Sequence, residues 1–485
     1  MASNTNCKRK STQQATPDRI KNRQVLKEMF REILFPSADI FADCNLHGNV
    51  KWKPDQLVSQ AILFSWQGDR FLIDAFDYSL KVCTDMGLNA VAYSYTSLFN
   101  ALAKYTPQLR LPVRKRLHDL AESVAGSCFR IGKFVPIAFD GSRVTTPRTA
   151  SNEQAFCAAN YGQGKTAKYR KKQTKGMRRT KNEKNKPHHP KPQVWLTMLW
   201  HMGLKLPWTW KTGPSNSSER AHVVEMLEEE TFPQDAFFCG DAGFIGYPLW
   251  SLILRKEADF LVRVGANVQL LATNMDYEKK SGGIVYCWPK GKRDSGAPPL
   301  RLRLVKVKIG RAKVWLLTSV VDSDQLNIQQ MIRMYKMRWG VEVEFRGLKQ
   351  TVDKHTLGCR TSARVTVELD WSLFALAFAE LLALREQLPS STPLDPEKPI
   401  RLSLAETMRA LRLAMRERNE TIALDSSLWN MLKEAVIQQY VNKTDKKARY
   451  RPANPDKKPL GDPQIRKPEP EERRNLRRFG RSTAA

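Results

Sequence analysis

Long apolar segments are missing from this chain of 485 residues. The longest candidate, Trp371–Leu384, contains Glu380 and falls short of the roughly 18 apolar residues that a membrane-spanning helix needs. Residues 1–14 are polar throughout, so we expect no secretory signal. The sequence therefore predicts a soluble, cytoplasmic protein without a membrane segment.

Cysteine and histidine are scarce and scattered. The chain has 8 cysteines without a Cys-x2-Cys pair, and its 7 histidines are adjacent only at His188-His189. Zinc sites and the disulfide frameworks of small secreted proteins need such residues in close groups. We therefore expect reduced thiols and neither a zinc site nor a disulfide framework.

Acidic residues are outnumbered by basic ones. Lys and Arg number 80 and Asp and Glu number 49, a formal net charge of 80 − 49 = +31. Residues 165–191 hold twelve basic residues and one acidic residue, a net of 12 − 1 = +11, and residues 443–485 hold fourteen and six. Such an excess favours a polyanionic partner, either nucleic acid or an acidic membrane surface. We interpret it as nucleic-acid binding, with DNA backbone contacts by residues 165–191; a solvated charge run that only aids solubility is the alternative.

Hydrophobic spacing divides the chain into regions of different character. Apolar residues recur at helical spacing up to residue 128, and short apolar strands then alternate with helical segments, which predicts an α/β core. The expected regions are 1–19, disordered; 20–128, a helical DNA-binding domain; 129–264, the first part of the core with an exposed basic loop at 165–191; 265–320, a β-rich insertion; 321–388, the second part of the core; 389–442, helical; and 443–485, a disordered basic tail.

Two aspartates follow short apolar runs that we expect to be buried strands. Phe134–Phe139 leads into Asp140-Gly141-Ser142, and Ala236–Cys239 leads into Gly240-Asp241-Ala242-Gly243. Ligands of α/β folds bind outside the carboxyl ends of strands, and small neighbours let a metal and a DNA backbone approach closely. Because Asp and Gly are also common where strands end in turns, each aspartate alone has a second interpretation as a turn residue.

A third acidic residue lies on an expected helix that ends near residue 350. At about 100° per residue, five side chains fall within an arc of about 80°, whereas Glu344 falls on the opposite face. The five are Tyr335, Arg338, Glu342, Arg346 and Lys349. Such a face could hold a phosphate diester while its carboxylate holds a metal; a solvated face with ion pairs four residues apart is the alternative.

Two glycines, Gly340 and Gly347, lie within this expected helix. Each is disfavoured there by about 1 kcal/mol relative to alanine. They leave two interpretations open, close approach to DNA or an irregular helix.

The three acidic residues together fit one chemistry better than any of them alone. Mg²⁺ prefers oxygen ligands and keeps several waters, so it needs only a few carboxylates. Two such ions can stabilise the attacking and the leaving oxygen of an in-line phosphoryl displacement. Asp140, Asp241 and Glu342, in a chain of net charge +31, supply the residues for this reaction on nucleic acid.

The spacing of the helix residues matches a known signature. Tyr335, Arg338, Glu342 and Lys349 follow the pattern Tyr-x2-Arg-x3-Glu-x6-Lys, and the two aspartate motifs precede them in the matching order. The sequence resembles the DDE transposases of bacterial insertion sequences over about residues 130–385.

This resemblance implies an RNase H-like catalytic core, a mixed sheet flanked by helices, with the β-rich insertion before Glu342. It implies that Asp140, Asp241 and Glu342 are catalytic and bind Mg²⁺, with two ions and possible replacement by Mn²⁺. Tyr335, Arg338 and Lys349 are implied to contact a DNA phosphate near the cleaved transposon end, and Arg346 shares their face.

The implied reaction is hydrolysis at the element's ends followed by attack of the freed 3′-hydroxyl on target DNA. We expect a homodimer on the DNA, because two element ends must be joined, and a cytoplasmic, nucleoid-associated protein. Three alternatives stay open: a Mg²⁺-dependent nuclease that cannot join strands, a repurposed non-catalytic DNA-binding protein, and a basic RNA-binding structural protein.

Overall fold

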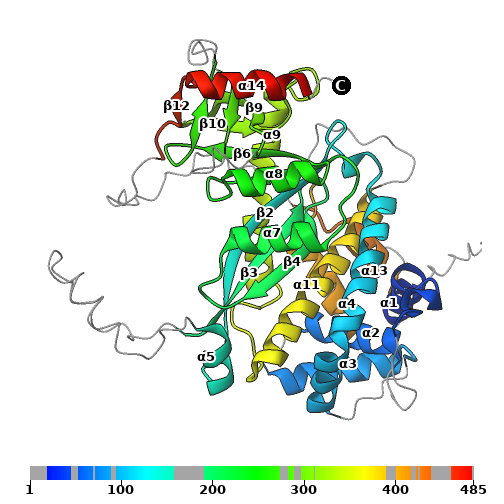
Figure 1. Cartoon of the computed structure of the whole chain (residues 1–485). Helices are drawn as coiled ribbons and strands as arrows, with labels where there is room; N and C mark the ends of the chain where they lie inside the picture. Colours follow the sequence, from blue (N-terminus) through cyan, green and yellow to red (C-terminus); the bar gives the residue numbers. More distant parts are fainter. Residues whose placement is uncertain are drawn as a thin grey trace, which may run out of the picture.

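A mixed β-sheet with helices on both faces runs through the computed structural model of the chain (Figure 1). Within the described residues it has ten strands in the order β12-β7-β8-β9-β10-β6-β5-β2-β3-β4. The strands β2, β5 and β6 are parallel to one another, whereas β3 and β4 on one side and β10 and β9 on the other are antiparallel. The expected mixed sheet flanked by helices is therefore confirmed.

The structure describes residues 19–44, 53–68, 71–88, 94–157, 191–273, 282–288, 297–310, 312–388, 400–416, 422–423, 426–437 and 460–482. Three predictions lie outside these residues. They are the disorder of residues 1–18, the basic loop apart from Lys191, and the first part of the tail, up to residue 459.

The strands nearest the site are buried along most of their length because helices cover both faces. Their bounds are β2, Val135–Thr145; β3, Gln193–His201; β4, Leu206–Gly213; β5, Ala236–Gly240; and β6, Asp259–Val264. Every residue of β5 is buried, as expected of a central parallel strand. The apolar runs from which the sequence predicts strands lie within these buried strands.

The two faces of the sheet carry different helices. On β3, Thr197 Oγ1 lies 3.0 Å from Nδ1 of His222 in α7 (Glu219–Glu229), whereas Trp200 Nε1 donates to Oε2 of Glu344 in α10 (Gly340–Gln350) at 3.3 Å. Residues three apart in a strand point to opposite faces. The helices α7 and α10 therefore lie on opposite faces of the sheet. The helices α8 (Tyr247–Arg255) and α11 (Ser362–Gln387) also flank the sheet (Figure 1).

The helices at both ends of the chain share one core around α11. They are α1, Asn22–Glu28; α2, Pro54–Trp66; α3, Leu72–Asp85; α4, Tyr95–Ala125; α12, Leu404–Arg416; and α13, Leu428–Lys433. Trp66 Nε1 donates to the carbonyl of Ala375 at 2.8 Å, and Trp371 Nε1 donates to Oγ1 of Thr106 at 2.9 Å. The described parts of residues 20–128 are largely helical, and these helices pack together with α12 and α13 around α11.

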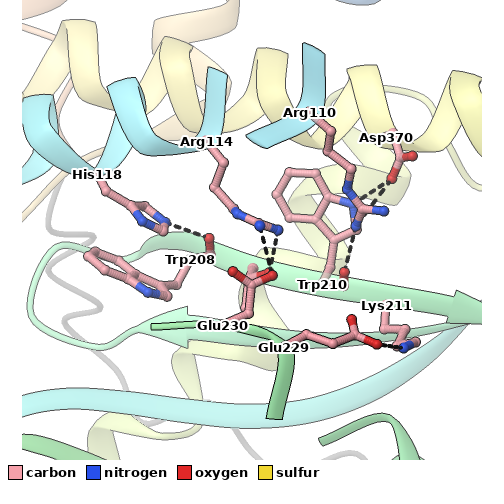
Figure 2. Close-up of polar contacts among 10 residues, drawn as sticks. Arg110, Arg114, His118, Trp208, Trp210, Lys211, Glu229, Glu230 and Asp370 are labelled. Atoms are coloured by element: carbon pink, nitrogen blue, oxygen red, sulfur yellow. Dashed lines mark hydrogen bonds and ion pairs between the residues drawn. The ribbon is translucent and has the colours of Figure 1, made fainter. Parts of the chain in front are cut away.

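Buried ion pairs attach α4 to the sheet (Figure 2). Arg114 contacts Glu230 at 2.8 Å and donates to Oγ1 of Thr209 in β4 at 3.1 Å. One turn earlier, Arg110 donates to the carbonyl of Trp210 at 2.7 Å and lies 3.8 Å from Asp370 of α11. These contacts cross between segments about 90 to 260 residues apart in sequence, so they fix the helical part against the sheet.

The β-rich stretch after residue 265 continues the same sheet. Its strands are β7, Gln269–Leu271; β8, Gly282–Cys287; β9, Leu300–Ile309; and β10, Ala312–Thr318. β10 pairs with β6 along Trp315–Thr318, so this stretch is not a detached β domain. The expected strands are present, and their hydrogen bonding to β6 makes them an extension of the core sheet.

The tail contradicts the prediction of disorder over residues 460–482. Strand β12 (Gln464–Arg466) pairs in parallel with β7, and α14 (Pro470–Ser482) follows it. Arg466 makes two contacts of 2.7 Å with Glu472, and Trp315 Nε1 donates to Asp462 at 2.6 Å. The sheet edge supplies main-chain partners that the basic, proline-rich composition of this segment does not indicate.

No helix in the described ranges has the length and hydropathy of a membrane span. The seven cysteines that the structure describes are free, and four of them are buried. The long helix α11 owes its apolar composition to burial in the core, with Leu373, Phe374 and Leu376 fully inaccessible.

Candidate active site

Two neighbouring parallel strands carry the two aspartates that the sequence predicts. Asp140 lies in β2 and Asp241 directly follows β5, and the last paired residues of the two strands are Ala138 and Cys239. The strand that holds Asp140 does not end there, as the sequence predicts, but continues to Thr145 because it stays paired with β3. Both aspartates therefore lie at the edge where the pairing of β2 with β5 stops.

Backbone amides orient both carboxylates. The N–H of Gly141 donates to Oδ1 of Asp140 at 2.8 Å, and the N–H of Gly243 donates to Oδ1 of Asp241 at 2.7 Å. Each bond uses one oxygen and leaves the second oxygen of the carboxylate for another partner. The small residues after each aspartate thus contribute amides that hold the carboxylate in place.

The helix that carries Glu342 is interrupted, which corrects the prediction of one continuous helix. The helix α9 (Ile328–Met337) ends before Arg338, and α10 begins at Gly340. Between them the amides of Val341 and Glu342 bond to carbonyls only three residues earlier, at 3.2 Å each, which tightens the turn. Glu342 therefore stands in the first turn of a new helix.

At this turn Gly340 packs directly on the indole of Trp200. A Cβ atom at this position would lie 2.1 Å from Cη2 of Trp200. Of the two interpretations left open for the glycines, the irregular helix describes Gly340. Glu344 lies on the opposite side from Glu342, as predicted, and is buried against the same Trp200.

Arg338 connects two of the predicted acidic residues. Its guanidinium lies 3.6 Å from Oδ2 of Asp140 and 3.8 Å from Oε1 of Glu342, and the residue is only 6% exposed. Its Nε and one terminal nitrogen are buried without a hydrogen-bond acceptor. The neighbouring carboxylates lie slightly beyond hydrogen-bond distance, so the guanidinium keeps donors that are free. It can therefore bind a further anionic group, such as a phosphate.

The three predicted acidic residues are close enough to affect one another. Burial raises the pKa of Asp140, the amide of Gly141 and Arg338 lower it, and the charge of Asp241 raises it. Burial also raises the pKa of Glu342. The charges of Asp140 and Asp241 raise this pKa further, whereas the charge of Arg338 lowers it. Side chains about 100 residues apart along the chain thus meet at one edge of the sheet.

The other predicted phosphate-binding residues surround this group at different distances. Lys349 donates to Oγ of Ser142 at 2.6 Å, two residues beyond Asp140. The ring of Tyr335 lies 5.5 Å from the guanidinium carbon of Arg338, and burial raises the pKa of its hydroxyl. Arg346 is exposed, and its charge lowers the pKa of Glu342. The three cations and the one phenol of the predicted face therefore lie beside the acidic residues.

A fourth carboxylate, which the sequence does not single out, joins the group. Glu219 is the first residue of α7, and its side chain lies over the backbone of Gly141. Burial raises the pKa of Glu219 to about 7, the charges of Asp140 and Asp241 raise it too, and Arg143 lowers it. An acidic residue in the first turn of a helix is common, because it offsets the helix dipole, so the sequence carries no distinctive signal for it.

The donors fit a hard divalent cation in their chemistry. Every candidate ligand is a carboxylate oxygen, the type that Mg²⁺ prefers, and Mg²⁺ needs only one or two of them because it retains waters. Within the described part of the chain, no three or more Asp, Glu, His or Cys side chains are arranged to hold one ion together. The positive group between Asp140 and Glu342 in this arrangement is the guanidinium of Arg338.

Gly340→Ala is expected to destabilise the protein by about 1–3 kcal/mol, because the added methyl group overlaps the buried ring of Trp200. The midpoint of urea unfolding measures this loss. Gly347→Ala in the same helix is the matched control, since its Cβ would meet only the end of the Leu404 side chain at 2.6 Å. Equal stability of the two variants would show that the packing of Gly340 on Trp200 does not constrain this turn.

Comparison with known proteins identifies the family of the chain. Residues 132–378 match the family model described as Transposase DDE domain, a range that includes all the acidic residues above. No curated protein matches the chain. Among solved structures, piggyBac transposase in a synaptic complex with hairpin DNA is similar, with a TM-score of 0.39 and 14% identity over 88% of this chain and 87% of that chain. Since the family model covers more than half of the 485 residues, the chain belongs to the family of proteins with a transposase DDE domain.

Proposed function

We propose that this protein is a DNA transposase that excises and inserts an insertion-sequence element by metal-dependent phosphoryl transfer. One observation supports this most strongly: Asp140 and Glu342 flank the buried Arg338, and the charge of Asp241 is near enough to raise the pKa of both. A purely structural DNA-binding protein would have no use for half-buried carboxylates that repel one another and DNA.

The metal site would consist of Asp140, Asp241 and Glu342 in an RNase H-like core. Two Mg²⁺ ions, or Mn²⁺ in their place, would supply Lewis-acid stabilisation of the attacking and leaving oxygens when bound. The amides of Gly141 and Gly243 hold the two aspartates in fixed orientations, so little reorganisation is needed before reaction.

The basic residues of the site would bind and orient the DNA phosphate. Arg338 has free buried donors and can bind a phosphate through two of them, while Lys349, Arg346 and Tyr335 flank it. In the first step a water oxygen bonds to phosphorus and the bond to the 3′-oxygen breaks, which frees a 3′-hydroxyl. In the second step that hydroxyl attacks a target phosphate, and the target's 3′-oxygen leaves with the proton.

The assembly follows from the substrate. Two element ends must be held together, so we infer a homodimer on DNA, associated with the nucleoid in the cytoplasm. Reading of the terminal repeats is assigned to residues 20–128, whose helices expose Lys104, Lys115 and Arg31. These assignments depend on the catalytic proposal and would fall with it.

Removal of divalent metal is expected to abolish cleavage of a supercoiled plasmid that carries the gene with its flanking DNA. With EDTA the plasmid should stay intact, and added Mg²⁺ or Mn²⁺ should restore cuts at the element's ends, mapped by sequencing the products. Cleavage that persists in EDTA would contradict the proposal.

A second assay separates a transposase from a nuclease. Pre-cut element ends with free 3′-hydroxyls are incubated with a target plasmid, and joined products are sequenced. Joining to target DNA is expected; cuts without joining would identify a metal-dependent nuclease instead. Binding of DNA with neither reaction would favour a non-catalytic DNA-binding protein.

A further inference from the structure

We propose that Glu219 is a fourth acidic residue of the catalytic site and shares the binding of a divalent cation with Asp140 and Asp241. The inference rests on the proposed function and adds a residue to it. Glu219 comes from α7, an element that carries none of the residues predicted from the sequence.

The backbone of β2 is shaped to let Glu219 reach the aspartates. A Cβ atom on Gly141 would lie 2.5 Å from Oε1 and 2.8 Å from Cδ of Glu219. Any residue other than glycine would therefore push this carboxylate away from its place next to Asp140. The φ of Gly141 lies outside the positive region that favours glycine, so the close approach of Glu219 accounts for its lack of a side chain.

Across the described ranges, Glu219 has no ion-pair partner. Arg143, whose charge acts on Glu219, stacks on Trp195 with 4.4 Å from the guanidinium carbon to the ring centroid, and it donates to the carbonyl of Ser215 at 3.4 Å. Among the described residues, no ion pair or hydrogen bond to the Glu219 carboxylate is formed. Within the described part of the chain, its carboxylate is therefore open to a further partner.

The surrounding charges indicate a cation in the same place. The carboxylates of Asp140 and Glu342 flank the buried guanidinium of Arg338, and Glu219 lies within reach of the charges of Asp140 and Asp241. Arg338 supplies one positive charge to this group, at ion-pair distance from Asp140 and Glu342, so the carboxylates outnumber it. One or two divalent cations would balance the excess of negative charge.

The competing explanation is that Glu219 only stabilises the start of α7. An acidic residue in the first turn contributes about 0.3–1 kcal/mol to helix stability, and Ser218 already caps this helix through a bond to Ala221. This role requires a negative charge at the helix start but no contact with Gly141. Metal affinity, measured directly, distinguishes the two roles.

Glu219→Gln is the test variant, and Glu228→Gln on an exposed position of the same helix is its control. Mn²⁺ binding is measured by electron paramagnetic resonance on the full chain, with circular dichroism to confirm folding. We expect Glu219→Gln to weaken Mn²⁺ binding by about 10- to 100-fold and Glu228→Gln to leave it unchanged. Unchanged Mn²⁺ affinity in Glu219→Gln would overturn the proposal.

A double variant tests the geometry independently. Gly141→Ala alone should weaken Mn²⁺ binding because its methyl group displaces Glu219. In a Glu219→Ala background the same change should have little further effect, since the obstructed side chain is gone. Additive losses would show that Gly141 and Glu219 act separately and would contradict the shared site.

The two proposals fail in different ways. If the wild type cuts DNA with Mg²⁺ and Glu219→Gln binds Mn²⁺ normally, the transposase proposal stands and the role of Glu219 is wrong. If the wild type neither binds Mn²⁺ nor cuts DNA, the proposed function fails, and the site of Glu219 fails with it.

Discussion

Asp140→Asn is expected to lower the rate of DNA cleavage by at least about 10³-fold while DNA binding persists. The amide has nearly the same size as the carboxylate and can still accept the hydrogen bond from Gly141, so the fold is retained. What it loses is the negative charge that would bind the cation beside Asp241 and Glu342. Cleavage is measured on the plasmid with its flanking DNA, and binding is measured by gel shift.

Asp119→Asn provides the control for this prediction. Asp119 is exposed on α4 and takes no part in the candidate active site, so its variant should cut DNA as the wild type does. Binding by Asp140→Asn should be equal or slightly stronger, since one carboxylate that repels DNA is removed. Wild-type cleavage by Asp140→Asn would exclude it as a catalytic residue and would favour a protein that binds DNA without cutting it.

Arg114→Ala is expected to destabilise the chain by about 3–5 kcal/mol, the largest change in stability that we predict. Arg114 and Glu230 are only 12% and 16% exposed, and their 2.8 Å contact joins α4 to the end of α7 (Figure 2). Without the guanidinium, the carboxylate of Glu230 stays buried near Thr209 with its main partner removed. The free energy of unfolding from urea titration, followed by circular dichroism, measures the loss.

An exposed pair gives the comparison. Arg409 and Glu406 lie 3.4 Å apart but are 80% and 48% exposed, so Arg409→Ala should cost less than about 0.5 kcal/mol. Replacing both buried partners, with Arg114→Met and Glu230→Leu, should recover part of the stability because no unpaired charge is left inside. A loss in Arg114→Ala no larger than that in Arg409→Ala would show that the pair does not hold α4 on the sheet.

Local patterns in the sequence were sufficient for the residues whose roles depend on short stretches of chain. The apolar runs before Asp140 and Asp241 are buried strands, and the helical spacing correctly separated Glu342 from Glu344. Such predictions succeed because the side-chain direction in a strand or helix repeats every two or about 3.6 residues, regardless of distant segments. The order of the three acidic residues along the chain is likewise read directly from the sequence.

Contacts between distant segments decided the remainder. The turn at Arg338 places Gly340 against Trp200 of another element, and Glu219 reaches the aspartates only because α7 crosses above Gly141. The tail strand β12 is ordered because an open sheet edge accepts it, although its composition is typical of disorder. The sequence by itself determined which residues carry charge and which segments form strands or helices, whereas only the tertiary structure determined which of them meet, because packing depends on partners far away in the chain.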